Sequence, residues 1–388
     1  MALLLLTGCS TRPKPPVAAD PFVFKALDLE QQDQRGRPTW ELRSPEARYD
    51  INRQLAQARQ PRGVIYKRGR PQIRIEAASG TVIGDGQAIQ LEGDVRITLL
   101  GKNPIVITGD QVRWIPADHL MAIDRRPVAT DQNSRIRARE ARYFLDRDLV
   151  ELRGSPQLDH WNRKPGMGQP KATSEPNAFR VHTGPVDWRP EQGDLQAPGA
   201  VRAERLTSEP IQPQRGRLVM TSAGLQGNLR QGFIDLQAPV LVRDQSKQGW
   251  LRAGSVRWSI NTQSLASAVP FSGQFKALKA QGQGFEVNLA HSILTVTGGC
   301  LLHQPGERLQ ANRCSWQWPS GRFAAQGAVR LQRQAYRQIT QATQLNGRIG
   351  VNGVAVFTAP GSKVHSQFTL PKQTPQAPRA RRAAPVRF

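Results

Sequence analysis

The sequence predicts an all-β fold, an elongated β-jellyroll formed by a V-shaped stack of antiparallel β-hairpin repeats. The first observation is a spacing of apolar or small residues at relative positions 0, 2, 5 and 7, as in Leu251, Ala253, Val256 and Trp258. Alternation is typical of a strand with one buried face, and the three-residue step from Ala253 to Val256 requires a bend or bulge. Two further observations, a repeat and a fixed turn, extend this pattern to the whole chain.

The same spacing recurs about nine times, with starts separated by roughly 27 to 45 residues. Self-similarity at such a period indicates a stacked array of one supersecondary unit. The copies begin at Leu42, Ile75, Ile107, Ile136, Val181, Met220, Leu251, Leu278 and Leu309.

A short turn-forming segment follows most copies and leads into a second alternating strand. Gly84-Asp85-Gly86 precedes the strand at 89–97, and Pro319-Ser320-Gly321 precedes the strand at 323–331. A fixed gap rich in Gly, Asp and Pro predicts a β-hairpin. The connections between successive hairpins vary in length, so we expect them together at the other end of the array. A parallel β-helix would need uniform coils, and the fixed and variable connections fit hairpins better.

The segments between and around the repeats give the predicted organisation of the chain. Loop residues without alternation separate two parts of the array, and a Pro-rich basic segment follows it. The predicted ranges are 1–8 for a truncated signal segment, 9–21 for a tether, 22–159 for a first β-jellyroll, 160–178 for a loop, 179–370 for further hairpins that continue the array, and 371–388 for a disordered basic tail.

The three cysteines divide by their context. Cys9 ends the sequence Leu6-Thr7-Gly8-Cys9, which fits the lipid-attachment box of bacterial lipoproteins, and a Pro-rich linker follows it as a tether requires. The apolar run before it is short and lacks a basic start, so either the signal segment is truncated or the match is accidental. Cys300 and Cys314 remain as an even pair, which fits a disulfide in an oxidising compartment or two buried thiols.

The formal net charge is +24, mostly from arginines spread along the whole chain. Such a charge attracts phosphates in nucleic acid, anionic lipid headgroups or lipopolysaccharide. Arginines at outward-facing strand positions explain the spread better than a dedicated nucleic-acid groove. No apolar run is long enough for a complete transmembrane helix.

Enzyme motifs are missing from the sequence. The six histidines are scattered without metal-ligand spacing, and no P-loop, GxSxG or dinucleotide-binding motif occurs in a strand-to-helix setting. We therefore expect no enzyme activity, no cofactor and no metal site. Tryptophans recur at the last position of the repeat, and packing between neighbouring hairpins explains them better than a stacking platform for sugars or bases: Trp114, Trp188, Trp258 and Trp316.

Many predicted inward positions carry small residues, including Gly93, Gly154, Gly298 and Gly327. Small residues either let the walls of a closed core approach each other or leave an apolar groove for acyl chains, and the sequence fits both. The candidate groove residues are Ser44, Ala47, Tyr49, Ala77, Ala138, Ala141, Ala253, Val256, Ala280 and Ala311.

The segment from Phe24 to Asp50, with Trp40-Glu41-Leu42 at its centre, resembles the start of the LptC domain of lipopolysaccharide export. Later phrases such as Ile75-Glu76-Ala77 resemble the repeat that this family shares with LptA/OstA proteins. The resemblance is moderately specific from Phe22 to Leu158 and weaker to Leu331. Because familiar members are about half as long, the chain would be a long form of the family.

The resemblance implies a non-enzymatic periplasmic bridge that passes the acyl chains of lipopolysaccharide along an apolar β-jellyroll. It also implies docking to the inner-membrane ABC transporter at one edge, and to an LptA-like bridge or outer-membrane translocon at the other. We expect a periplasmic protein tethered to a membrane, with the inner membrane favoured and no nucleic-acid partner. The alternatives are a structural spacer of the cell envelope and a basic nucleic-acid-binding protein.

Overall fold

The computed structural model describes residues 22–161, 179–205, 218–244, 248–318, 320–348 and 355–369. The chain divides into two compact units, Met1–Val150 and Glu151–Phe388. The predicted tether with Cys9, residues 162–178 of the predicted loop, and the tail after residue 369 lie outside the described residues. No helix among the described residues is long and apolar enough to cross a membrane.

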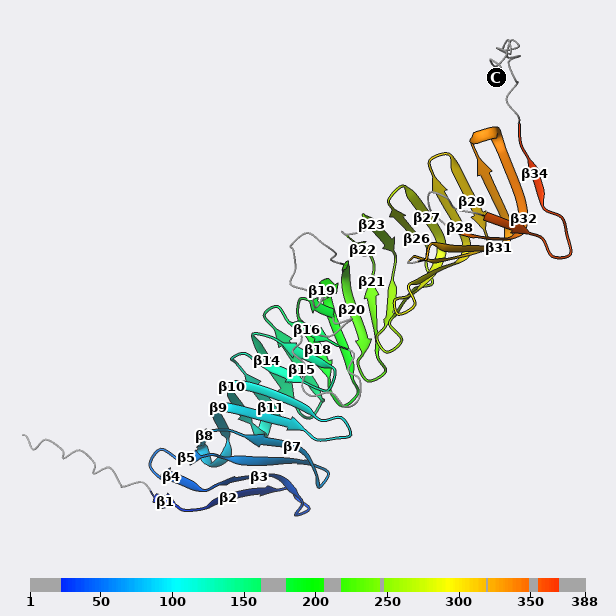
Figure 1. The fold of residues 1–388 in the computed structure, drawn as a ribbon. Helices are drawn as coiled ribbons and strands as arrows, with labels where there is room; N and C mark the ends of the chain where they lie inside the picture. Colours follow the sequence, from blue (N-terminus) through cyan, green and yellow to red (C-terminus); the bar gives the residue numbers. More distant parts are fainter. Residues whose placement is uncertain are drawn as a thin grey trace, which may run out of the picture. The chain divides into compact units, whose positions relative to one another are not determined.

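Each unit is a stack of bent antiparallel hairpins, as predicted (Figure 1). The bend divides every hairpin into two arms, and arms of neighbouring hairpins pair into two leaves. Leaf A contains the arms that meet at short four-residue turns, and leaf B contains the arms at the opposite end. The predicted bend at Ala253–Val256 is the point where β23 (Gly249–Ala253) ends and β24 (Val256–Ser259) begins.

Within each leaf of the first unit the short strands follow one another in this order, with two long strands between the fourth and the fifth. Leaf A contains β1 (Phe22–Phe24), β4 (Glu46–Asp50), β5 (Leu55–Arg59), β8 (Ser79–Ile83), β11 (Leu120–Ile123) and β14 (Glu140–Phe144). Leaf B contains β2 (Leu27–Gln32), β3 (Pro38–Ser44), β6 (Arg62–Lys67), β7 (Arg70–Glu76), β12 (Val128–Thr130) and β13 (Ser134–Arg137). Two long strands run through both leaves, β9 (Ala88–Leu99) and β10 (Ile105–Ile115).

The second unit repeats the arrangement. Besides β24, leaf A contains β15 (Leu149–Arg153), β18 (Val186–Arg189), β21 (Phe233–Gln237), β25 (Ser264–Ser267), β30 (Arg313–Gln317) and β33 (Ala355–Thr358). Besides β23, leaf B contains β16 (Gln157–His160), β17 (Phe179–His182), β22 (Val240–Asp244), β26 (Phe271–Phe275), β29 (Glu307–Ala311) and β34 (His365–Gln367). The strands through both leaves are β19 (Asp194–Arg205), β20 (Leu218–Asn228), β27 (Leu278–Asn288), β28 (Ile293–Gln304), β31 (Arg322–Arg333) and β32 (Gln338–Arg348). Among the described residues there are three short 3-10 segments, Gly84–Gly86, Pro116–Asp118 and Ala335–Arg337.

The turns of leaf A are uniform, which confirms the fixed gap in the sequence. Nine connections of four residues each join arms of leaf A in the described chain, for example residues 51–54 and 260–263. In eight of them the fourth residue has a left-handed backbone, as at Gln54 and Gly193. A left-handed residue at this place matches the twist of the two strands that the turn joins. The connections at the end of leaf B vary in length, also as predicted.

The corner between the leaves depends on a second set of left-handed residues. In β9 and β31 these are the pairs Gly93-Asp94 and Gly327-Ala328. A Cβ atom at Gly327 would lie 2.6 Å from the Nδ2 atom of Asn312, so this corner needs glycine. The assignment of Gly93, Gly154, Gly298 and Gly327 to the inner face is therefore wrong, because they form the corner and none of them is buried.

The core lies between the leaves. On β9, Ile89, Leu91, Val95 and Ile97 are at most 1% exposed, and they alternate with outward polar residues on both sides of the corner. The start of the first unit bends at residues 25–26, between β1 and β2. The bend lets β1 pair with β4 of leaf A while β2 pairs with β3 of leaf B.

Candidate functional site

The interior of the second unit contains an apolar cavity of about 100 Å³ between its two leaves. Both leaves contribute large apolar side chains, and almost all of the exposed cavity wall is carbon. Leaf B supplies Leu251, Phe271, Phe275, Leu278, Ala280 and Leu302, and leaf A supplies Leu294, Val296, Cys314, Trp316 and Phe323.

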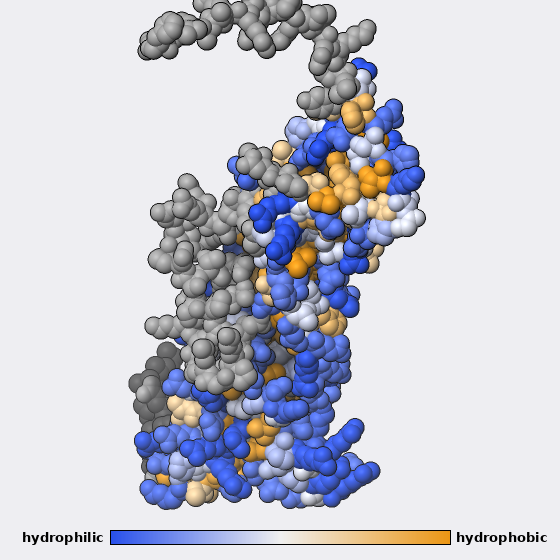
Figure 2. Space-filling model, turned by 45° about the vertical axis from the view of Figure 1, so that its right-hand side comes forward, coloured by the Kyte–Doolittle hydropathy of each residue, from blue (hydrophilic) through white to orange (hydrophobic). Residues whose placement is uncertain are grey.

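The cavity exists because the leaves of these hairpins are not fully packed against each other. Leu278, Leu294 and Leu302 remain partly exposed, whereas the corresponding large side chains of β9 in the first unit are fully buried. Phe275 of leaf B and Trp316 of leaf A meet edge to face with ring centroids 5.1 Å apart. Hydrophobic residues also reach the surface towards the C-terminal hairpins (Figure 2). The wall of this site is thus open to an apolar ligand.

A disulfide joins the two leaves beside this cavity. Cys300 lies on the leaf B part of β28 and Cys314 lies on β30 of leaf A. Each cysteine is 3% exposed, and their Cα atoms are 5.9 Å apart. The bond therefore fixes the distance between the leaves on the corner side of the cavity.

The ten predicted groove residues lie at different places, and of these only Ala280 lines the apolar cavity. Ala47, Ala141 and Val256 are packed in the core at 3% exposure or less. Ser44 is buried too, and its hydroxyl donates to the carbonyl oxygens of Glu46 and Arg59 at 2.7 and 2.8 Å. The core positions therefore hold the leaves together.

The remaining predicted residues lie at the corner or near a turn. Ala77 and Ala138 are corner residues whose amide groups donate to Pro61 and Pro127. Ala253 and Ala311 are buried beside a wider hollow of about 820 Å³ on the outside of the corner, which is lined by both polar and apolar residues. Tyr49 donates its hydroxyl to Asp85 in a turn at 3.0 Å.

The sequence analysis did not identify the large residues that line the open part of the interior. Small residues occur where the leaves converge, whereas large residues away from the corner separate the leaves and form the cavity wall. Leu278 and Trp316 occupy positions 0 and 7 of their repeats, so the signal was a large residue at the first or last repeat position. Trp114 and Trp258 pack edge to face on Trp40 and Phe179, whereas Trp316 lines the cavity.

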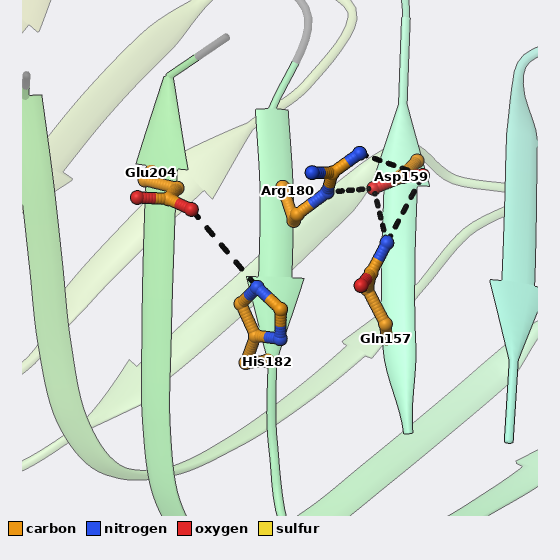
Figure 3. A network of polar contacts seen from close by, with 5 residues as sticks. All are labelled: Gln157, Asp159, Arg180, His182 and Glu204. Atoms are coloured by element: carbon orange, nitrogen blue, oxygen red, sulfur yellow. Dashed lines mark hydrogen bonds and ion pairs between the residues drawn. The ribbon is translucent and has the colours of Figure 1, made fainter. Parts of the chain in front are cut away.

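A polar network covers part of the outer face of leaf B in the second unit (Figure 3). Arg180 on β17 donates to both carboxylate oxygens of Asp159 on β16, at 2.7 and 3.4 Å. Gln157 donates to the same carboxylate, whose side chain is only 2% exposed. The hydrogen bond to Asp159 raises the pKa of the Arg180 guanidinium, which therefore stays charged. His182 and Glu204 approach each other to 4.0 Å beside this pair.

The network joins the three neighbouring strands β16, β17 and β19 through side-chain hydrogen bonds and ion pairs. No group of three or more potential metal ligands occurs among the described residues. The chemistry available in the interior is apolar contact.

The first strands of the first unit and the last strands of the second unit each leave one edge unpaired in the described chain. In the first unit β1 pairs with β4 and β2 pairs with β3, and neither has a second partner in the described chain. In the second unit β33 and β34 pair with β32 alone. Such edges have free backbone donors and acceptors that can pair with the strand of another protein.

A comparison with protein-family models relates the first part of the chain to a known family. Residues 8–155 match the model of the family described as lipopolysaccharide-assembly, LptC-related. This part of the chain is similar to the LptC-related family. The family takes part in lipopolysaccharide transport in the cell envelope, and the match covers the first unit and its border with the second. A search of curated proteins found no match to the chain.

Proposed function

We propose that this LptC-related protein is a non-enzymatic periplasmic bridge that carries lipopolysaccharide with its acyl chains held between the leaves. The observation that supports the proposal is the apolar cavity between the leaves of the second unit. Acyl chains bind by removal of apolar surface from water, which needs a carbon-lined wall and no specific polar partner. Energy for movement would come from the ATPase of a separate transporter.

The unpaired edges support docking at both ends of the array. One edge would pair with the periplasmic part of the inner-membrane ABC transporter, and the other with an LptA-like bridge or the outer-membrane translocon. The disulfide between Cys300 and Cys314 fits the oxidising periplasm. Cys9 is proposed as the site of a lipid tether, with the inner membrane as the favoured location.

Photo-crosslinking in cells tests the acyl-chain site. A photoreactive amino acid at Ala280 or Leu302 faces the cavity, and capture of lipopolysaccharide is the expected result. Lys279 is the matched control because it is the outward-facing neighbour of Ala280 on β27. Equal capture from both positions, or capture from Lys279 alone, would contradict binding between the leaves.

The closed interior of the first unit favours a second candidate function, a structural spacer of the cell envelope. Ile89, Val95 and Met121 are each 0% exposed in the core between its leaves. Depletion separates the two functions. Loss of a bridge should leave lipopolysaccharide at the inner membrane, whereas loss of a spacer should leave its distribution unchanged.

A further inference from the structure

The outer face of leaf A in the first unit has two rows of side chains with contrasting chemistry. The apolar row contains Ile115 of β10, Leu120 of β11 and Phe144 of β14, which are cross-strand neighbours. The arginine row, two residues closer to the corner, contains Arg113, Ala122 and Arg142 on the same three strands. Because successive outward residues alternate with core residues, both rows face away from the interior.

The apolar row extends to neighbouring strands of the same leaf. Ile83 on β8 is 36% exposed and pairs with Ala88 on β9 and Leu55 on β5. Outward positions of a solvated sheet normally carry polar side chains. Ile115, Leu120 and Phe144 are half-buried and Ile83 is exposed, so the row presents apolar side chains that another molecule can cover.

The two arginines of the arginine row are both exposed, and neither has an ion-pair partner among the described residues. They lie two strands apart, about 10 Å between backbones, with only the small side chain of Ala122 between them. Both guanidinium groups can therefore reach the same anion above Ala122. A third cation, Arg147, lies 4.2 Å over the ring of Phe144 and is close to Asp146.

The second unit has the same three-strand arrangement without these features. Its counterpart of the arginine row is Arg257, Ala266 and Glu286, so one of the two cations is replaced by an anion. Arg257 is already neutralised by Asp235, with two hydrogen bonds of 2.7 and 2.8 Å. The counterpart of the apolar row is fully polar: Ser259, Ser264 and Asn288. The fold therefore does not require the two rows, and their presence in the first unit needs another explanation.

We propose that the outer face of leaf A in the first unit is a docking surface for a bilayer that contains anionic phospholipid. Arg113 and Arg142 bind a lipid phosphate together, and the side chains of Ile115, Leu120 and Phe144 contact the hydrocarbon beneath the headgroups. This surface lies on the outside of the leaf, so it is separate from the cavity between the leaves.

The order of the two rows favours a bilayer over an acidic protein. A membrane interface presents anionic phosphates and hydrocarbon as adjacent layers, and the surface presents arginines and apolar residues as adjacent rows. The acidic outward residues Glu92 and Glu140 lie on the corner side of the arginine row. Asp118 and Asp146 lie in the turns on the other side of the apolar row, where Asp146 is 3.8 Å from Arg147. Glu92 and Glu140 therefore lie farther from the hydrocarbon than the two arginines do.

Co-sedimentation of the full chain with vesicles tests the surface. Wild type should bind vesicles of equimolar phosphatidylglycerol and phosphatidylcholine and not vesicles of phosphatidylcholine alone. Arg113→Gln with Arg142→Gln should lower the partition coefficient about 25-fold, because each basic side chain near an anionic surface contributes about fivefold. Arg113→Lys with Arg142→Lys should retain most of the binding, and Leu120→Ser should weaken it without a change in charge.

The matched control is Arg257→Gln with Arg322→Gln, which removes the same charge from the outer face of leaf A in the second unit. An equal loss in the control would show that binding follows net charge only, and would overturn the proposal. The proposal would also be overturned if inorganic phosphate competed with the vesicles at constant ionic strength and Leu120→Ser had no effect on binding. That result would indicate an isolated phosphate site. The proposal would also be overturned if the wild-type protein bound no vesicles and captured an acidic protein instead. Circular dichroism of each variant establishes that it is folded.

Discussion

Filling the cavity of the second unit with Ala280→Leu should stabilise the protein and at the same time block lipid binding. Ala280 lies on β27 between Gly273 and Leu302, with its side chain on the cavity wall. Most substitutions in a packed core that enlarge a side chain destabilise the protein. The opposite sign is expected here because the added carbon atoms enter unfilled space.

Two calculations give the magnitude. Three added carbon atoms at about 0.8 kcal/mol each amount to roughly 2 kcal/mol if they become fully buried. A cavity of about 100 Å³, at about 24 cal/mol per Å³, costs roughly the same. Since the cavity is partly open, we expect about half of this, near 1 kcal/mol, which corresponds to an increase in Tm of about 2 to 4 °C for a unit of this size.

Calorimetry of the second unit's transition measures the stability, and photo-crosslinking from Leu302 measures lipid capture. Ala325→Leu is the matched control, because Ala325 is 0% exposed in a filled part of the same unit. This variant should lower the free energy of unfolding by about 1 to 3 kcal/mol. A lower Tm for Ala280→Leu would refute the cavity. A higher Tm with undiminished lipid capture would refute the assignment of the cavity to acyl chains.

Three further predictions concern the residues that hold the two-leaf fold. Arg180→Met should destabilise the second unit by about 3 kcal/mol in urea denaturation, because the buried Asp159 loses its cation. Glu204→Gln should change the stability little, because Glu204 is 4.0 Å from its partner His182. Gly327→Ala should lower the stability more than Gly306→Ala does. Both positions have a left-handed backbone, but only at Gly327 does another atom lie within 4 Å of the new Cβ. An equal decrease in Tm for the two glycine variants would contradict the close contact at the corner. Cys300→Ala with Cys314→Ala should lower stability by about 3 kcal/mol, as for a closed loop of about this length, and make the denaturation midpoint insensitive to reductant.

The local pattern of the sequence was enough to predict the hairpins, their uniform turns and the bend. Alternation, the step from Ala253 to Val256 and turn residues such as Gly193 are properties of neighbouring residues, so they can be read without knowledge of the fold. The same pattern could not distinguish a small inward residue from a residue needed for a left-handed backbone. For this reason Gly93 and Gly327 were assigned to the inner face although they form the corner.

The open part of the interior was decided only by the tertiary structure. Leu278, Leu294, Leu302 and Trp316 come from four strands, and the space between them depends on the distance between the leaves. Likewise, Arg113 and Arg257 occupy the same repeat position, but only the pairing of strands places Asp235 beside one and leaves the other without an ion pair. Sequence therefore determined the repeating hairpin and the resemblance of its first part to a known family, whereas contacts between distant strands decided where the stack is open and which charges remain unpaired.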